Sequence, residues 1–97
     1  MEDLVIQWAE NRGIFKHGTV AGQVEKLKEE VQELLEALDL DNIHEVADAI
    51  GDIQVVLIIL AEMKGLSAEE CLQDAYAIIN KRKGKMQNGV FVKENAA

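Results

Sequence analysis

The chain contains no proline and only one cysteine, and each shortage narrows the class of protein it can be. Because proline breaks helices, its absence is consistent with an all-α domain. The single thiol, Cys71, excludes an intrachain disulfide framework, and we expect it to be a small packed residue. The sequence also shows no Ser-His-Asp or Cys-His arrangement and no glycine-rich phosphate loop, which disfavours those catalytic and binding classes.

Basic residues are scarce as well: 10 Lys and Arg stand against 18 Asp and Glu, and the net charge is −8. Duplex DNA and RNA are bound through Lys and Arg that release counterions, so we expect no nucleic-acid partner. Small phosphorylated ligands are not excluded, because a bound metal ion reverses the local field. His17 and His44 have no second His or Cys at ligand spacing, which argues against a zinc site.

No hydrophobic run is long enough to cross a bilayer. The longest, at residues 50–61, is IGDIQVVLIILA, which is shorter than the roughly 20 residues of a membrane helix and is flanked by acids. The N-terminal MEDLVIQW lacks the basic start of a signal peptide. We therefore expect a soluble cytoplasmic protein with no membrane partner.

The apolar spacing predicts an all-α fold in a single domain of residues 1–97. Apolar residues recur at three- and four-residue steps, which is typical of helices with one buried face. The four expected helices and the tail span about 2–12, 19–39, 42–64, 68–83 and 84–97. A loop is expected between the first two helices, at Gly13 to Thr19.

Residues at the expected helix ends support this division. Asp41 is a suitable N-cap for the third helix, and Gly65 suits the position after its last residue. Ser67 to Glu70 has the pattern of a capping box that opens the fourth helix. The apolar residues of that helix, which we expect to face inward, are Leu72, Ala75, Tyr76 and Ile79.

The 50–61 run also predicts assembly. A helix that is apolar on nearly all sides requires burial all round, and a chain of 97 residues buries only about two-thirds of its unfolded surface. We therefore expect a homodimer or homotetramer. In the tail, Asn88-Gly89 is a turn signal, and Val90-Phe91-Val92 is expected to be a short extended piece that packs or swaps onto a neighbour.

Six acids at helical spacing are the candidate functional residues. Glu29, Glu30 and Glu33 precede the expected turn near residues 39–42, and Glu45, Asp48 and Asp52 follow it. Residues three, four or seven apart share a helix face, and a short connection makes the two helices antiparallel neighbours. Clustered carboxylates repel one another unless a cation lies among them, and oxygen ligands suit Mg²⁺ or Mn²⁺. The alternative is a pair of solvated acidic stripes.

The position of the last two acids favours the metal. Asp48 and Asp52 stand where the strongly apolar run begins, and carboxylates at such an edge need a partner. Lys26 and Lys28 are near in sequence, but two lysines are too few for six acids. We therefore expect a cation among the carboxylates.

Two stretches, KLKEEVQEL at Lys26–Leu34 and DAIGDI at Asp48–Ile53, resemble the MazG-like nucleotide pyrophosphohydrolases of the all-α NTP pyrophosphatase superfamily. Their hallmark is E-E-x-x-E on one helix and E-x-x-D, often ending in Gly-Asp, on the next. The resemblance implies a four-helix MazG-like bundle completed by oligomerisation. It also implies Mg²⁺-dependent cleavage of (d)NTPs between the α and β phosphates, giving a monophosphate and pyrophosphate in nucleotide-pool house-cleaning.

The resemblance carries three metal ligands over directly: Glu30, Glu33 and Asp52. The fourth should be a Glu three residues before Asp52, where this chain has Ala49. A turn centred near residue 40 places Glu30 and Glu33 level with residues 48–52, so Asp48 is our choice for the missing ligand. The earlier pair Glu45-Asp48 is the alternative second motif. Glu45 and Glu29 are held in reserve as further ligands, and Glu29 is our candidate base for the attacking water.

Candidate substrate-binding residues lie outside the acidic motifs. The cations suited to binding phosphates are Lys26, Lys81, Arg82 and Lys85, with Lys83 beside them. The alternative for the later ones is a helix C-terminus that complements its macrodipole. Family members often carry a Lys where this chain has Ile78, which puts part of that set in question.

Two aromatic residues, Trp8 and Phe15, are candidates for stacking a nucleotide base. Trp8 lies on an apolar stripe and has a core role as its alternative. Phe15 lies in a Gly-flanked loop and is therefore our preferred candidate of the two.

Two other functions stay open at this point. A non-catalytic helical interaction module would have solvated acids and no response to Mg²⁺. A phosphoribosyl-ATP pyrophosphohydrolase would use the same scaffold, but that relative usually shows Asp-Leu-Leu-Tyr-His after its acids. This chain has Asp52-Ile53-Gln54-Val55-Val56 there, so we rank this alternative below the MazG-like function.

Overall fold

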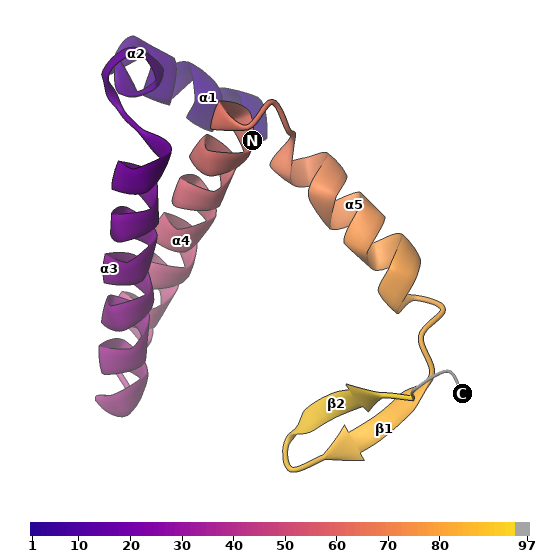
Figure 1. The fold of residues 1–97 in the computed structure, drawn as a ribbon. Helices are drawn as coiled ribbons and strands as arrows, with labels where there is room; N and C mark the ends of the chain where they lie inside the picture. The colour runs from indigo at the N-terminus through magenta and orange to yellow at the C-terminus, as the bar shows by residue number, and fades with distance from the viewer. Residues whose placement is uncertain (95–97) are drawn as a thin grey trace.

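The computed structural model describes residues 1–94 and shows five helices followed by a β-hairpin (Figure 1). The all-α class is thus confirmed, with a short two-stranded addition at the C-terminal end. No helix among residues 1–94 is long and apolar enough to cross a membrane. The elements are α1 (Glu2–Asn11), α2 (Ile14–His17), α3 (Val20–Asp39), α4 (Ile43–Met63), α5 (Ala68–Ile79), β1 (Gly84–Gln87) and β2 (Val90–Lys93).

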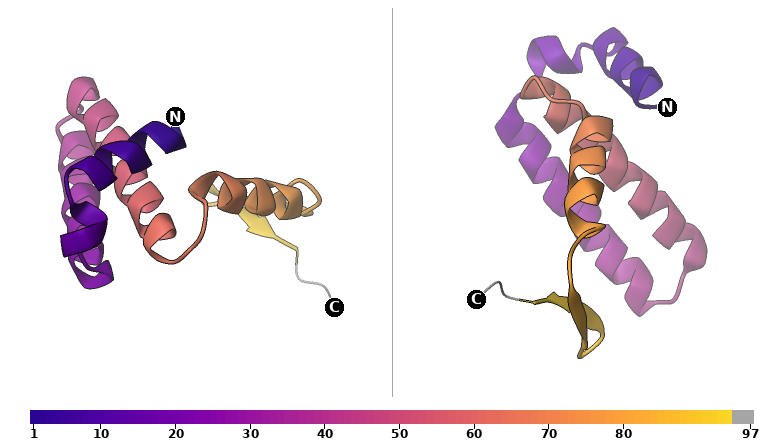
Figure 2. Two further views of the ribbon diagram at one scale, coloured as in Figure 1. Left: turned by 90° about the horizontal axis from the view of Figure 1, so that it is seen from above. Right: turned by 90° about the vertical axis from the view of Figure 1, so that its right-hand side faces the viewer.

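The centre of the molecule is the antiparallel pair α3–α4, with α1 lying across the end where α3 begins and α4 finishes (Figures 1 and 2). Two of the five buried residues of this pair are alanines: Ala37 is 1% exposed and Ala49 is 3% exposed. Small side chains let the two backbones approach closely, which is what brings side chains on neighbouring faces together. Ala9 of α1 and Val56 and Ile59 of α4 complete the core.

The turn between α3 and α4 differs from the expectation in its cap. Asn42, not Asp41, is the N-cap of α4, because its Oδ1 accepts a hydrogen bond from the Glu45 N–H at 3.3 Å. Asp41 instead adopts a left-handed conformation with φ of 51° and reverses the chain. An N-cap residue needs an extended backbone, so Asp41 cannot take that position while it makes the turn.

The start of α5 is held by α1 as well as by its own cap. Ser67 Oγ accepts from the Glu70 N–H at 3.2 Å, which is one half of the expected capping box. The other partner comes from far away in sequence: the Glu2 carboxylate accepts from Ser67 Oγ at 3.0 Å and from the Ala68 N–H at 2.9 Å. Gly65 has φ of 71°, so its expected place after the end of α4 is confirmed.

Three element boundaries differ from those expected. Residues 14–17 form the one-turn helix α2 inside the expected loop. The last helix ends at Ile79 rather than near residue 83. Most of the expected tail is a hairpin: Val90–Lys93 pairs antiparallel with Gly84–Gln87. Residues 95–97 of the expected tail lie outside the described residues.

The hairpin follows from its turn and from one glycine. Asn88 and Gly89 have φ of 51° and 84°, the positive values that a tight two-residue hairpin turn requires. Gly84 pairs with Lys93 at the open end. A Cβ at Gly84 would lie 2.7 Å from the Phe91 ring and would overlap the Val92 carbonyl oxygen, so only glycine lets this end close.

One chain leaves much of its apolar surface uncovered. The α5 residues expected to face inward are exposed, with Leu72 at 65% and Tyr76 at 60%, and α5 has no buried residue. On α4, Leu57 is 45% exposed, so this helix is not buried all round within one chain. The reason is visible in Figures 1 and 2: α5 and the hairpin extend away from α3–α4 instead of packing on them.

Two global quantities agree with this description. The radius of gyration is 16.3 Å, whereas a compact domain of this length has a value of about 12.5 Å. The accessible surface is 7764 Å², whereas about 5,500 Å² is typical of a monomer of this mass. One chain by itself is therefore more extended, and exposes more surface, than a closed monomer of this length.

We predict that the protein sediments as a dimer or a larger assembly at micromolar concentration in analytical ultracentrifugation. Leu57→Asp should give insoluble or unfolded protein, because it places a charge on an apolar face that we expect a second copy to cover. Glu62→Gln, a change at an exposed polar position of the same helix, is the matched control and should assemble normally. A well-folded wild-type monomer would contradict the prediction.

Candidate metal centre

Three carboxylates meet between α3 and α4. Glu30 and Glu33, one turn apart on α3, and Asp52 on α4 each have an oxygen within 4.8 Å of the others. These are the three ligands that the family resemblance indicated, and the helical spacing predicted that they would converge. The two helices hold them by close packing, since Ala37 and Ala49 are almost fully buried.

Among the three carboxylates, Glu30 gives the strongest indication that a cation binds here. Its side chain is buried, and its Oε1 pairs with the Lys26 Nζ at 3.2 Å. Its Oε2 is buried and has no hydrogen-bond partner among the described residues. A buried carboxylate oxygen without a partner is costly, because its hydration is lost and nothing replaces it. A cation beside Glu33 and Asp52 would supply that partner, so the donor set fits a divalent metal.

The neighbouring carboxylates disfavour the ionised form of Glu33. The pKa of Glu33 is raised first because its protonated form can donate a hydrogen bond to the Glu30 carboxylate, then by the negative charge of Glu30 and, more weakly, of Asp52. Protonation of Glu33 relieves this repulsion when no cation is present. A bound cation would relieve it in another way and would favour the ionised form.

Lys26 belongs to the same network. It lies 3.2 Å from Glu30 and 3.7 Å from Glu29, and its pKa is raised mainly by the hydrogen bond and charge of Glu30. The lysine proposed for phosphate binding is thus engaged with an acid of the cluster. Glu29 is exposed and points its carboxylate to Lys26 rather than to Glu33 or Asp52, whose group it does not join.

An acidic cavity of 340 Å³ opens beside the cluster. Asp48 and Glu45 line this cavity, but the Asp48 oxygens are not part of the tight three-carboxylate group. The residues around it are Glu33, Glu36, Glu45, Asp48, Ala49 and Asp52. Ala49, where the family resemblance led us to expect a Glu ligand, lies on the cavity wall.

Glu36 is a site residue that the sequence interpretation missed. It lines the cavity and accepts a hydrogen bond from Gln32 Nε2 at 3.2 Å. The signal was present, because Glu36 follows Glu33 by three residues and therefore lies on the same helix face.

The two aromatic candidates lie in different places. Trp8 lines a cavity of 330 Å³ whose wall includes Asp52, so this ring borders the acidic cluster. The Arg12 guanidinium lies 5.7 Å from the centre of the Trp8 ring. Phe15 lines another cavity, of 290 Å³, together with Ile6, Glu10 and Glu62, and none of these belongs to the cluster.

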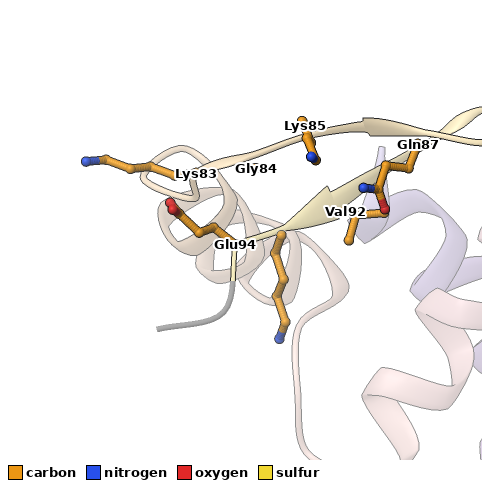
Figure 3. A pocket seen from close by; sticks show the side chains of 7 residues that line it. Lys83, Gly84, Lys85, Gln87, Val92 and Glu94 are labelled. Atoms are coloured by element: carbon orange, nitrogen blue, oxygen red, sulfur yellow. The ribbon is translucent and has the colours of Figure 1, made fainter. Parts of the chain in front are cut away.

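The candidate phosphate-binding cations at the C-terminal end are not beside the acids of their own chain. Lys81 and Arg82 follow α5, and Lys85 lies on β1. A cavity of 480 Å³ lies at the open end of the hairpin and is lined by Lys83, Gly84, Lys85, Gln87, Val92, Lys93 and Glu94. Figure 3 shows this end of the hairpin from close by. No residue of α3 or α4 lines it, so one chain keeps its acidic cavity and its basic segment apart.

Two antiparallel helices that direct carboxylates into one shallow cavity define a candidate divalent-metal centre of an all-α protein. The phosphoribosyl-ATP pyrophosphohydrolase family model matches residues 9–83, and the chain belongs to this family. The match places the chain in the all-α NTP pyrophosphatase superfamily, whereas the finer MazG-like assignment is not confirmed. No curated protein and no solved structure matches the chain significantly.

We predict opposite effects of Glu33→Gln on the protein with and without metal. Without divalent ions the variant should melt at a higher temperature than wild type, because it removes a charge that Glu30 and Asp52 repel. With Mn²⁺ the wild type should gain stability by mass action, and the variant should lose most of that gain. Thermal melts with and without Mn²⁺ measure both effects.

Glu25→Gln is the matched control, since Glu25 lies on α3 and pairs with Lys28 outside the cluster. It should keep the wild-type response to Mn²⁺. If neither melting nor titration calorimetry of wild type responds to Mg²⁺ or Mn²⁺, the cluster is a solvated surface.

Proposed function

We propose that this protein is a divalent-metal-dependent nucleotide pyrophosphohydrolase that cleaves between the α and β phosphates and releases a monophosphate and pyrophosphate. The observation that carries the proposal is the unpartnered, buried Oε2 of Glu30 beside Glu33 and Asp52. Family membership supports the reaction class, since the family is named for a pyrophosphohydrolase. Mg²⁺ is the proposed ion, with Mn²⁺ as a substitute.

The chain's own residues would divide the work. Glu30, Glu33 and Asp52 would hold the ion, with Asp48 as the fourth carboxylate from the cavity wall. A bound Mg²⁺ neutralises phosphate charge and lowers the pKa of coordinated water. Glu45 lines the same cavity and is better placed than Glu29 to accept a proton there, because Glu29 faces Lys26.

Two substrate classes fit this reaction. A canonical or modified (d)NTP fits the resemblance to the MazG-like enzymes, and we propose nucleotide-pool house-cleaning as the role. Phosphoribosyl-ATP is the second candidate, and the family match at residues 9–83 favours it. Against it, Gln54-Val55-Val56 stands where that relative usually shows Leu-Tyr-His. Either substrate would be cleaved at the anhydride between its α and β phosphates. A parallel assay with Mg²⁺ decides between them by showing which one is hydrolysed.

A non-catalytic helical module is the remaining alternative. In such a module no bound cation would offset the free-energy cost of burying the Glu30 Oε2 without a hydrogen-bond partner. Absence of turnover with every nucleotide tested, together with no response to Mg²⁺, would favour this alternative.

We predict that hydrolysis yields the monophosphate and pyrophosphate, and never the diphosphate with free phosphate. Asp48→Ala should lower turnover by about a hundredfold or more, as loss of electrostatic stabilisation at a reacting phosphate usually does. Glu45→Ala should have a smaller effect. Ion-exchange chromatography of the products and initial rates measure both. The reverse ranking of the two variants would make Glu45, as a ligand or as the base, more important than Asp48 and would contradict our choice of Asp48 as the fourth ligand.

We also predict that Trp8, rather than Phe15, binds the base, because its cavity shares Asp52 with the metal centre. Trp8→Ala should raise the KM for nucleotide roughly tenfold by removing stacking, while inhibition by pyrophosphate stays as in wild type. Phe15→Ala is the control and should leave the nucleotide KM unchanged. An increase in KM with Phe15→Ala alone would reverse the assignment.

A further inference from the structure

The two carboxylate oxygens of Glu30 have different surroundings. Oε1 pairs with the Lys26 Nζ at 3.2 Å, whereas Oε2 is buried and has no hydrogen-bond partner among residues 1–94. The Glu30 side chain is 5% exposed, and that of Lys26 is 53% exposed. The lysine therefore reaches from the surface to a buried carboxylate and occupies one of its oxygens, which leaves a single oxygen for another ligand.

Helix stability does not account for this ion pair. At a spacing of four residues, an isolated helix is stabilised more when Glu precedes Lys, and here Lys26 precedes Glu30. The ion pair of α3 that lies outside the cluster has the acid first: Glu25 precedes Lys28, at 3.3 Å, and both side chains are well exposed. The contact between Lys26 and Glu30 therefore points to a role in the site rather than in the helix.

Lys26 is also the one cation that pairs with an acid of the cluster in the part of the chain that the structure describes, residues 1–94. Its Nζ is held by a second acid, because Glu29 Oε2 lies 3.7 Å away. All three residues lie on α3, so the contact does not depend on how α3 and α4 are placed. A carboxylate held at one oxygen loses less conformational entropy when a ligand fixes it.

Mg²⁺ and Ca²⁺ place different demands on such a carboxylate. Mg²⁺ requires near-octahedral geometry with oxygens at about 2.0–2.1 Å, whereas Ca²⁺ accepts six to eight oxygens at about 2.3–2.6 Å and can take both oxygens of one Glu. Bidentate binding to Glu30 would put Ca²⁺ on the oxygen that the Lys26 ammonium occupies. Two cations on one oxygen repel each other, so Lys26 disfavours the bidentate mode.

We propose that Lys26 is a positioning residue of the metal centre: it holds Oε1 of Glu30, makes this ligand bind the ion through Oε2 alone, and thereby favours Mg²⁺ over Ca²⁺. The proposal rests on the metal centre of the proposed function. It gives Lys26 a role different from the phosphate binding that the sequence indicated. Glu33 and Asp52 form no ion pair within residues 1–94, so Glu30 is the ligand through which this selectivity acts.

The test compares the dissociation constants of Mg²⁺ and Ca²⁺, each measured by displacement of bound Mn²⁺, with free Mn²⁺ followed by electron paramagnetic resonance. Lys26→Met removes the ammonium and keeps a long side chain. Loss of a positive charge tightens both ions alike, because both are divalent, so the ratio of the two constants isolates positioning. We expect the preference for Mg²⁺ over Ca²⁺ to fall about tenfold, the lower end of what the hydrogen-bond partners of metal ligands contribute.

Two further variants serve as controls. Lys26→Arg keeps a cation that can donate to Glu30 and should preserve the wild-type ratio. Lys28→Met removes one cation from the same helix, where its partner Glu25 lies outside the cluster, and should also preserve the ratio. An unchanged ratio in Lys26→Met overturns the proposal, because Lys26 would then act only as a neighbouring charge. A fall of the same size in Lys26→Arg or Lys28→Met overturns it as well.

Binding of pyrophosphate separates this role from phosphate binding. Titration calorimetry of Mg²⁺-loaded protein measures the affinity for pyrophosphate, which Lys26→Met should leave close to that of wild type. An unchanged ratio of metal affinities together with weaker binding of pyrophosphate would overturn the proposal and return Lys26 to the phosphates.

Failure of this role and failure of the proposed function give different results. Wild-type protein that binds none of the three ions overturns both. If wild-type protein binds Mg²⁺ and Lys26→Met shifts the ratio as expected, but no nucleotide is hydrolysed, the proposed reaction is overturned and the positioning role stands. Hydrolysis with an unchanged ratio overturns the positioning role alone.

Discussion

The close packing of α3 against α4 is the constraint on which the candidate site depends. Ala37 and Ala49 are almost completely buried, and their small side chains let the helices approach closely. Glu30, Glu33 and Asp52 then each have a carboxylate oxygen within 4.8 Å of the others. Carboxylates at this distance repel one another, and the charge of Glu30 is one of the causes that raise the pKa of Glu33. The apolar core on α4 must therefore hold an arrangement that is unfavourable by itself, which is typical of a site built for a ligand.

A single chain leaves its candidate site and much of its apolar surface uncovered. Its acidic cavity has Lys26 as its neighbouring cation, its longest apolar helix is only partly covered, and α5 buries none of its residues. These features have one physical cause: the extended placement of α5 and the hairpin leaves surfaces of complementary charge and apolar character without contacts in one copy. The predicted assembly would bury this apolar surface.

The sequence predicted local structure well, but it did not predict contacts between residues that are far apart in the chain. Helical spacing identified six candidate acids, of which three meet, and Asn88-Gly89 indicated the hairpin turn. Asp48, our choice for the fourth ligand, does not join the group because its oxygens lie outside the 4.8 Å cluster. The Glu2 contact with Ser67 spans 65 positions and has no sequence signature. The exposure of α5 was missed because an amphipathic pattern says that a face is buried, but not whether its own chain or another copy covers it.

The direct test of the metal centre is a crystal grown with Mn²⁺ and measured at the manganese absorption edge. The account predicts one anomalous peak in each chain among Glu30, Glu33 and Asp52, about 2.2 Å from their oxygens, as expected for a hard divalent ion. A chain whose three carboxylates remain together with no peak among them, in crystals soaked at saturating Mn²⁺, would contradict it.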